Sequence, residues 1–94
     1  MAIGLLTLQL SLPGCSSLKE KRGRLKPLLA RLHREFNISV AEMGKQDSWD
    51  ETVIACAYIS NDNRQTQRAL QEIPRWIERN WPDVTLVDDH LEVL

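Results

Sequence analysis

The sequence predicts one α+β domain whose elements follow the order β-α-β-β-α-β. Two kinds of hydrophobic periodicity predict it. Four segments are apolar either at every second position or continuously, and two longer segments are apolar at every third or fourth position. Ninety-four residues are enough for one hydrophobic core, and domains rarely divide below this length. We therefore expect residues 1–94 to form a single domain.

The first predicted strand covers residues 2–12, where every even position from 6 onward is leucine. This alternation indicates one buried face and one mixed face. Pro13-Gly14 ends the strand. Ser17, with Glu20 three residues later, then forms a capping box that starts a helix, in which the Glu20 side chain is expected to reach back to Ser17.

That helix carries an apolar stripe that consists of Leu18, Leu25, Leu29, Leu32 and Phe36, with Leu28 beside it. Gly23 and Pro27 are unfavourable inside a helix, by about 1 and about 3 kcal/mol relative to alanine. Both fall opposite the stripe at 100° per residue. We therefore expect a bend on the solvent side rather than two separate helices.

Two strands, 37–43 and 52–60, follow and form a hairpin through the polar residues 44–50. Asn61-Asp62 caps a second helix, whose apolar stripe consists of Thr66, Leu70, Ile73, Ile77 and Trp81, with a kink expected at Pro74. Pro82-Asp83 stops this helix. The last strand covers residues 84–93 and is expected to be interrupted at 88–90.

With right-handed crossovers, this order predicts the ferredoxin-like fold, a four-stranded antiparallel sheet with both helices on one face. The first and third strands are expected at its centre because they are the most apolar. We expect the third strand to run parallel to the first, so that Cys15 and Cys56 lie about 20 Å apart, too far for a disulfide. Cys15, in a loop beside basic residues, is expected to be the more reactive thiol.

Four blocks of sequence resemble one known family. They are Ser17-Leu18-Lys19-Glu20-Lys21-Arg22, residues 36–42, Gln46-Asp47-x-Trp49 and Ser60-Asn61-Asp62. In this order and at these spacings they resemble the YlxP-like family of small bacterial proteins, the domain of unknown function five hundred and three. The resemblance covers essentially the whole chain and implies a ferredoxin-like fold but no activity. Because genes of this family often lie beside genes for translation initiation and ribosome maturation, it also hints at ribosomal RNA or ribosomal proteins as partners.

The charge distribution points to the first helix. The net charge is only −1, but residues 1–47 carry +4 and the rest carry −5. Residues 19–34 hold seven bases and one acid. Such a cluster can contact phosphates. We name as candidate nucleic-acid-binding residues Lys19, Lys21, Arg22, Lys26, Arg31 and Arg34, with the Lys21 stem expected to lie near the apolar stripe. The alternative is a solvated helix face.

The sequence gives weaker evidence for functional sites outside the first helix. Tyr58 is the one aromatic residue of the two central strands, which disfavours RNA stacking on the sheet. Asp88 and His90 lie on one side of the last strand and Asp89 on the other, at best half a metal site. No motif for catalysis, metal or cofactor binding occurs. Trp49 in the hairpin is expected to pack over the sheet edge more readily than to bind a partner, and Trp76 is expected to be partly exposed.

These observations favour a non-enzymatic binding module that associates with RNA or ribosomes through its first helix. The alternative is a homo-oligomeric ligand-binding or regulatory domain that uses the open sheet face. Ile3, Leu5 and the apolar third strand predict that this face is partly apolar, and a homodimer would cover it. No apolar run approaches the length of a membrane span, no signal peptide is evident, and we expect a cytoplasmic protein.

Overall fold

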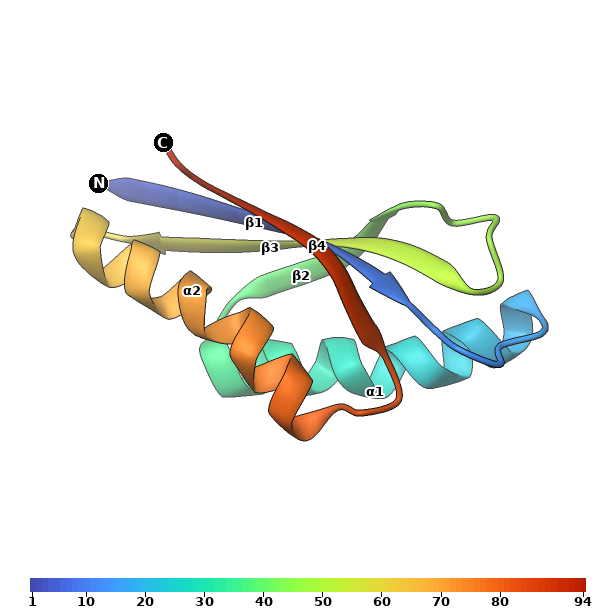
Figure 1. The fold of residues 1–94 in the computed structure, drawn as a ribbon. Helices are drawn as coiled ribbons and strands as arrows, with labels where there is room; N and C mark the ends of the chain where they lie inside the picture. The colour runs from blue at the N-terminus through green and yellow to red at the C-terminus, as the bar shows by residue number, and fades with distance from the viewer.

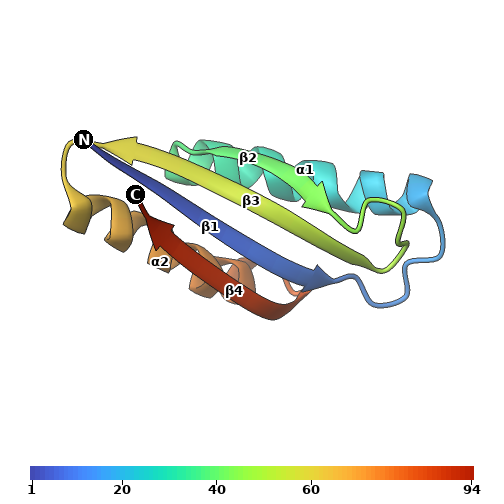
Figure 2. The ribbon, with the colours of Figure 1, turned by 90° about the horizontal axis from the view of Figure 1, so that it is seen from above.

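A four-stranded sheet backed by two helices forms the whole of the computed structural model, which describes residues 1–94. The elements are β1 (Ala2–Ser11), α1 (Leu18–Phe36), β2 (Ser39–Gly44), β3 (Glu51–Ser60), α2 (Asn63–Asn80) and β4 (Thr85–Val93). The strand order is β2-β3-β1-β4, and all neighbours are antiparallel. Both helices lie against one face and leave the other open (Figures 1 and 2). The predicted ferredoxin-like fold is confirmed.

The central strand β1 pairs with β3 on one side and β4 on the other, as expected from its apolar sequence. Its even residues from Leu6 to Leu12 are buried, and they meet the inward residues of the helices in one core of fifteen buried side chains. β4 runs without interruption through residues 88–90, contrary to expectation. The β1–β4 pairing instead contains a β-bulge, which shifts the register between Gln9 and Leu10.

The expected parallel run of β1 and β3 is wrong. The crossover helix α1 makes β2 parallel to β1, and the hairpin then reverses β3. Cys56 therefore lies opposite Leu6, and the chain runs on from Leu6 to a turn at Leu12 before it reaches Cys15. The six residue steps from Leu6 to Leu12 correspond to roughly 20 Å along the strand direction. Both thiols are free. Cys15 is only 8% exposed, because a turn at Gly14 (φ +76°) directs it into the core rather than into an open loop.

Both helices begin where the sequence predicts. The Ser17 hydroxyl accepts a hydrogen bond from the Glu20 amide, and the Asp62 carboxylate accepts one from the Arg64 amide. α1 continues as one helix past Gly23 and Pro27, both of which are exposed, and α2 continues past Pro74. Neither helix has the length and apolar character that a membrane crossing requires.

The buried row of α1 differs from the predicted stripe. It consists of Lys21, Leu25, Leu28 and Leu32, whereas Leu18 and Leu29 are only partly buried. These four residues follow one another at spacings of four, three and four, as on the buried side of a helix. A pattern read from the sequence leaves Lys21 out of this row because it is charged. The core side of α1 is therefore rotated from the predicted one, toward Lys21.

Candidate nucleic-acid interface

The two helices hold nearly all the positive charge. Together they carry eleven of the twelve Lys and Arg residues and four of the thirteen acids, a net charge of +7. The strands and loops carry the remaining base, Lys45, and nine acids, a net charge of −8, which together restore the overall −1. Because the helices form one layer (Figure 1), the molecule has a basic helix layer and an acidic sheet layer.

Four of the six predicted phosphate-contacting residues lie free on α1. Lys19, Arg22 and Lys26 are three and four positions apart, which places them in one row on the outer side of the helix. Arg34 lies about two turns further along. All four side chains are exposed, and none takes part in an ion pair within the protein. We call these four residues the basic row.

Lys21 is not part of this surface, and its assignment to a nucleic-acid interface is wrong. It is 2% exposed, and its ammonium group donates to the carbonyl oxygens of Lys45 and Ser48, both at 2.7 Å. The same Nζ lies 2.9 Å from the carboxylate of Glu42, which also accepts from the Thr52 hydroxyl. Lys21 thus has all three of its donors used, and it fastens the β2–β3 hairpin to α1.

Two arginines on the flank of α1 that faces α2 are also engaged. Arg24 donates to the carbonyl oxygens of Pro13 at 2.9 Å and Asp83 at 2.7 Å, and so links the loops before α1 and after α2. Arg31 lies 3.6 Å from the carboxylate of Glu35, and its guanidinium is 5.4 Å from the ring centre of Trp76. Arg31 is half-buried, so it can reach a ligand only at the boundary between the two helices.

The N-terminus of α1 is already occupied by a carboxylate of the chain itself. Glu20 accepts from the Ser16 amide at 2.9 Å and from the Ser16 hydroxyl at 3.1 Å, one residue earlier than the capping box predicts. These hydrogen bonds lower the pKa of Glu20. An external phosphate would compete with this carboxylate, so the helix N-terminus is a poor anion site.

A cluster of aromatic rings joins the C-terminal halves of the two helices. Trp76 stacks on Trp81 with ring centres 6.1 Å apart, and its other contact is edge-to-face with Phe36 at 5.9 Å. Trp76 is half-buried, as predicted. The sequence places Trp81 on a core stripe and gives no sign that it joins Trp76 and Arg31, because these residues come together only when α1 and α2 pack.

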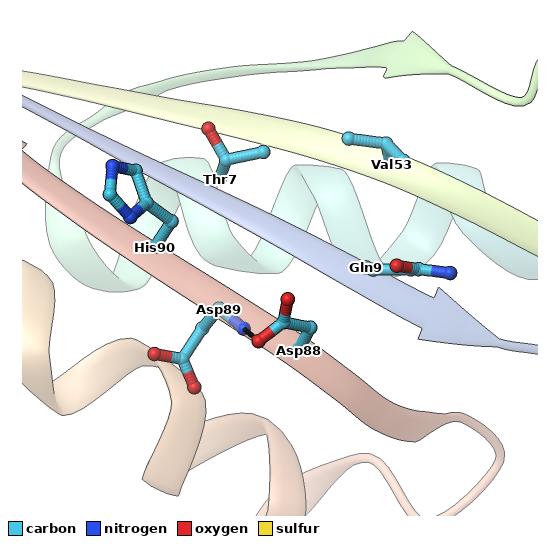
Figure 3. A pocket seen from close by; sticks show the side chains of 6 residues that line it. All are labelled: Thr7, Gln9, Val53, Asp88, Asp89 and His90. Atoms are coloured by element: carbon cyan, nitrogen blue, oxygen red, sulfur yellow. Dashed lines mark hydrogen bonds between the residues drawn. The ribbon is translucent and has the colours of Figure 1, made fainter.

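The open face of the sheet contains a shallow hollow beside the β4 bulge (Figure 3). Its lining consists of Thr7, Gln9, Val53, Asp88, Asp89 and His90. Asp88 and His90 lie on this face and Asp89 points to the other, as the alternation predicts. No three His, Cys, Asp or Glu side chains gather to form a metal-binding group anywhere in the chain.

The rest of the open face is apolar toward the end where β1 begins. Ile3 pairs with Ile59 across the two central strands, and Leu94 donates its amide hydrogen to the Ile3 carbonyl. Ile59 is 62% exposed and Leu94 is 73% exposed. Trp49 at the hairpin is 55% exposed, so the expectation that it packs over the sheet edge is wrong. The hairpin is held by Lys21 instead, which leaves the indole outside.

Comparisons with known proteins agree with this architecture. A family model described as "Protein of unknown function (DUF503)" matches residues 3–90. The chain belongs to the DUF503 family. It is also similar to the uncharacterized protein YlxP of Bacillus subtilis (strain 168), with 40% identity over 68 residues that cover 72% of this chain and 73% of YlxP. The resemblance inferred from the four sequence blocks is therefore confirmed.

One solved structure shares the fold of this DUF503 chain, and a second is less similar to it. The first is a protein of Chloroflexus aurantiacus named as an antibiotic biosynthesis monooxygenase, with a TM-score of 0.56 and 15% identity over 100% of this chain and 93% of that one. The second is SnoaB of Streptomyces nogalater, a cofactor-independent oxygenase, with a TM-score of 0.49 and 12% identity over 99% and 90%. At these identities the first likeness concerns the fold alone.

Proposed function

We propose that this DUF503 protein is a non-enzymatic module that binds RNA, in free form or in the ribosome, through the basic row of α1. The observation that supports this most is the division of charge between the layers. With the buried Lys21 left out, phosphates approaching the helix layer meet a net charge of +6, whereas those approaching the sheet meet acidic side chains.

The residues of the basic row have no ion-pair partner within the protein, and this supports the same proposal. Lys21, Arg24 and Arg31 have partners within the protein and contribute to its fold. Lys19, Arg22, Lys26 and Arg34 have no such role, and their exposed groups have no carboxylate partner that a phosphate would have to displace. The main free-energy cost of binding an anion here is therefore the loss of side-chain entropy when these residues become ordered.

The test is the salt dependence of binding to a structured RNA, measured by filter binding or anisotropy. With about four phosphates neutralised, log affinity should fall against log salt with a slope of roughly −3. A variant with Lys19→Gln, Arg22→Gln and Lys26→Gln should bind much more weakly and with a slope reduced by about 2. Circular dichroism and urea unfolding check that this variant folds.

A control variant changes the net charge by the same three units elsewhere. Asn61→Asp, Gln67→Glu and Gln71→Glu are substitutions of exposed residues in and before α2. This control should retain most of the RNA affinity and the salt slope. If the control and the basic-row variant weaken binding equally, only net charge matters and the proposed interface is wrong.

A second proposed function uses the open sheet face, on which Ile3, Ile59 and Leu94 are exposed. In this proposal two copies pack their open faces together, and the dimer is the form that carries out a binding or regulatory role. The flat area of the four-stranded sheet is roughly 550 Å², without the additional surface of the side chains that project from it. This approaches the ~800 Å² per partner of an ordinary stable interface. The two proposals are compatible, because the helix layers of such a dimer face outward.

A further inference from the structure

A small hollow lies where α2 ends and the chain turns toward β4. Its lining consists of Asn80, Trp81, Pro82 and Asp83, and its volume is about 190 Å³. Pockets for drug-sized ligands begin at about 300 Å³. The hollow is also open to solvent at the surface. It therefore fits one flat group that is attached to a larger ligand, rather than a whole enclosed molecule.

Trp81 is one of the lining residues, and its indole is held by a neighbouring ring. It stacks on Trp76 at an interplanar angle of 25°, and Phe36 supports Trp76 from α1. Arg31 lies over the Trp76 ring and adds a cation–π contact. A half-buried aromatic side chain that is already held in place loses little entropy when a second ring stacks on it.

The charges around the hollow distinguish a base from a phosphate. Asp83 is one of the lining residues, and the negative charge of its carboxylate repels an anion placed nearby. The same carboxylate can accept a hydrogen bond from an amino or imino group of a base. Outside the hollow, Arg24 donates to the Asp83 carbonyl, so a guanidinium lies close to where the sugar-phosphate chain of that base would pass.

We propose that this hollow binds one unpaired nucleobase of an RNA strand whose neighbouring phosphates lie on the basic row. The base stacks on Trp81 and Pro82 and donates to Asp83. This inference rests on the proposed RNA-binding function. Arg24 connects the hollow to α1 through the Asp83 carbonyl, and it lies two positions from both Arg22 and Lys26 of the basic row. A strand crossing α1 would contact both the hollow and this row.

Fluorescence tests the stacking directly. The chain has three tryptophans, so a Trp49→Phe protein reports only Trp76 and Trp81. Titration with a single-stranded oligoadenylate RNA should quench this fluorescence. Inorganic polyphosphate with the same number of phosphates should bind to the basic row without quenching. Saturable RNA binding with no change in the fluorescence of these two residues would overturn the inference.

Substitutions give a second readout. Trp81→Leu should lower the affinity for oligoadenylate about tenfold, the order expected for the loss of one stacked base, and leave polyphosphate affinity unchanged. Trp81→Phe should retain most of the affinity. Trp49→Leu, at the hairpin, is the matched control and should have no effect on either ligand.

The outcomes separate this inference from the proposed function. If Trp81→Leu and Trp49→Leu bind RNA equally well while the basic-row variant does not, the base site is wrong and the RNA interface stands. If the unsubstituted protein binds neither RNA nor polyphosphate, both are wrong. If Trp81→Leu does not fold, the fluorescence titration, which leaves the hollow unchanged, decides.

Discussion

At the scale of single residues, Lys21 is the one charged residue that is buried in this protein. Its ammonium lies in the interior and joins α1 to two carbonyls of the hairpin and to Glu42. Removal of one partner of a buried pair leaves the other groups without compensation. Because Glu42 is about one quarter exposed, water can recover part of this loss.

We expect Lys21→Met to lower the free energy of unfolding by about 2–4 kcal/mol, since the methionine can fill the space but cannot satisfy the two carbonyls and the carboxylate. Urea unfolding at neutral pH measures it. Lys19→Met, two residues earlier and exposed, is the matched control and should change stability by less than about 0.5 kcal/mol. Equal effects of the two substitutions would contradict the assigned role.

Cys56 gives the protein a pH dependence in the alkaline range. Burial raises the pKa of this thiol from its ordinary value of 9.0 to about 12. Between these two values the unfolded chain has lost the proton and the native protein has kept it. The buried Cys56 thiol therefore does not lower the free energy of unfolding below about pH 9. As the pH rises from 9 toward 12, the free energy of unfolding falls by about 1.4 kcal/mol per pH unit.

Urea unfolding at several pH values from 8 to 11, under reducing conditions, should show this slope in the unsubstituted protein and in Cys15→Ala. Cys56→Ala should lack it, although its stability at pH 8 is lower because of the cavity it creates. The comparison between variants removes every contribution that the three proteins share and leaves that of Cys56. Parallel curves for all three would show that Cys56 is accessible to water.

At the scale of elements, α2 packs on β1 through Gly4. A Cβ added at Gly4 would lie 2.5 Å from both the Leu70 Cδ1 and the Thr66 Cγ2 atoms. Both side chains are fully buried, and the Thr66 hydroxyl is hydrogen-bonded to that of Ser60 at 2.7 Å, so neither can move freely. This close approach explains why a glycine stands among the buried positions of β1, most of which are leucine.

We expect Gly4→Ala to destabilise the protein by about 1–3 kcal/mol through overpacking. Gly23→Ala should have the opposite sign. No atom lies within 4 Å of a Cβ at Gly23, and alanine in the interior of a helix is favoured over glycine by about 0.5–1 kcal/mol. Thermal or urea unfolding of the two variants provides the comparison. If Gly23→Ala is also destabilising, the expectation that a methyl group at position 23 meets no steric obstacle is wrong.

The elements themselves could be predicted because their signals are local. Alternating leucines define β1, and Ser17 and Asp62 define the helix starts within the chain segments that they cap. The inward position of Lys21 and the burial of Cys15 could not be predicted in this way. Both depend on groups brought from elsewhere in the chain: the carbonyls of the hairpin for Lys21 and the packed core for Cys15.

At the scale of the whole molecule, the open face should govern association. Packing of the apolar end against its copy would bury Ile3 and Ile59. We expect light scattering at low micromolar concentration to give twice the 10.8 kDa chain mass. Ile3→Glu with Ile59→Lys should yield monomers that remain folded. A single-chain mass that does not change as concentration rises would contradict the dimer and leave the face free for another partner.

The candidate interface could be predicted only in outline. A run of seven bases and one acid identifies α1 from the sequence, but it does not distinguish the free bases from those that hold the fold. Lys19 and Lys21 are two residues apart, yet one is exposed and the other is buried, because only one points at the hairpin. Which bases are free is a property of the packed molecule.

The position of β1 between β3 and β4 has a consequence for how the protein is made. β1 is synthesised first, but its partner residues in β4 lie about eighty positions later, as in the pairing of Gly4 with Val93. One hydrogen-bonding edge of the nascent strand therefore stays without its partner until β4 has left the ribosome. Such long-range pairing slows folding, toward the range of milliseconds to seconds. During that wait, β1 is the segment most exposed to chaperones and to aggregation.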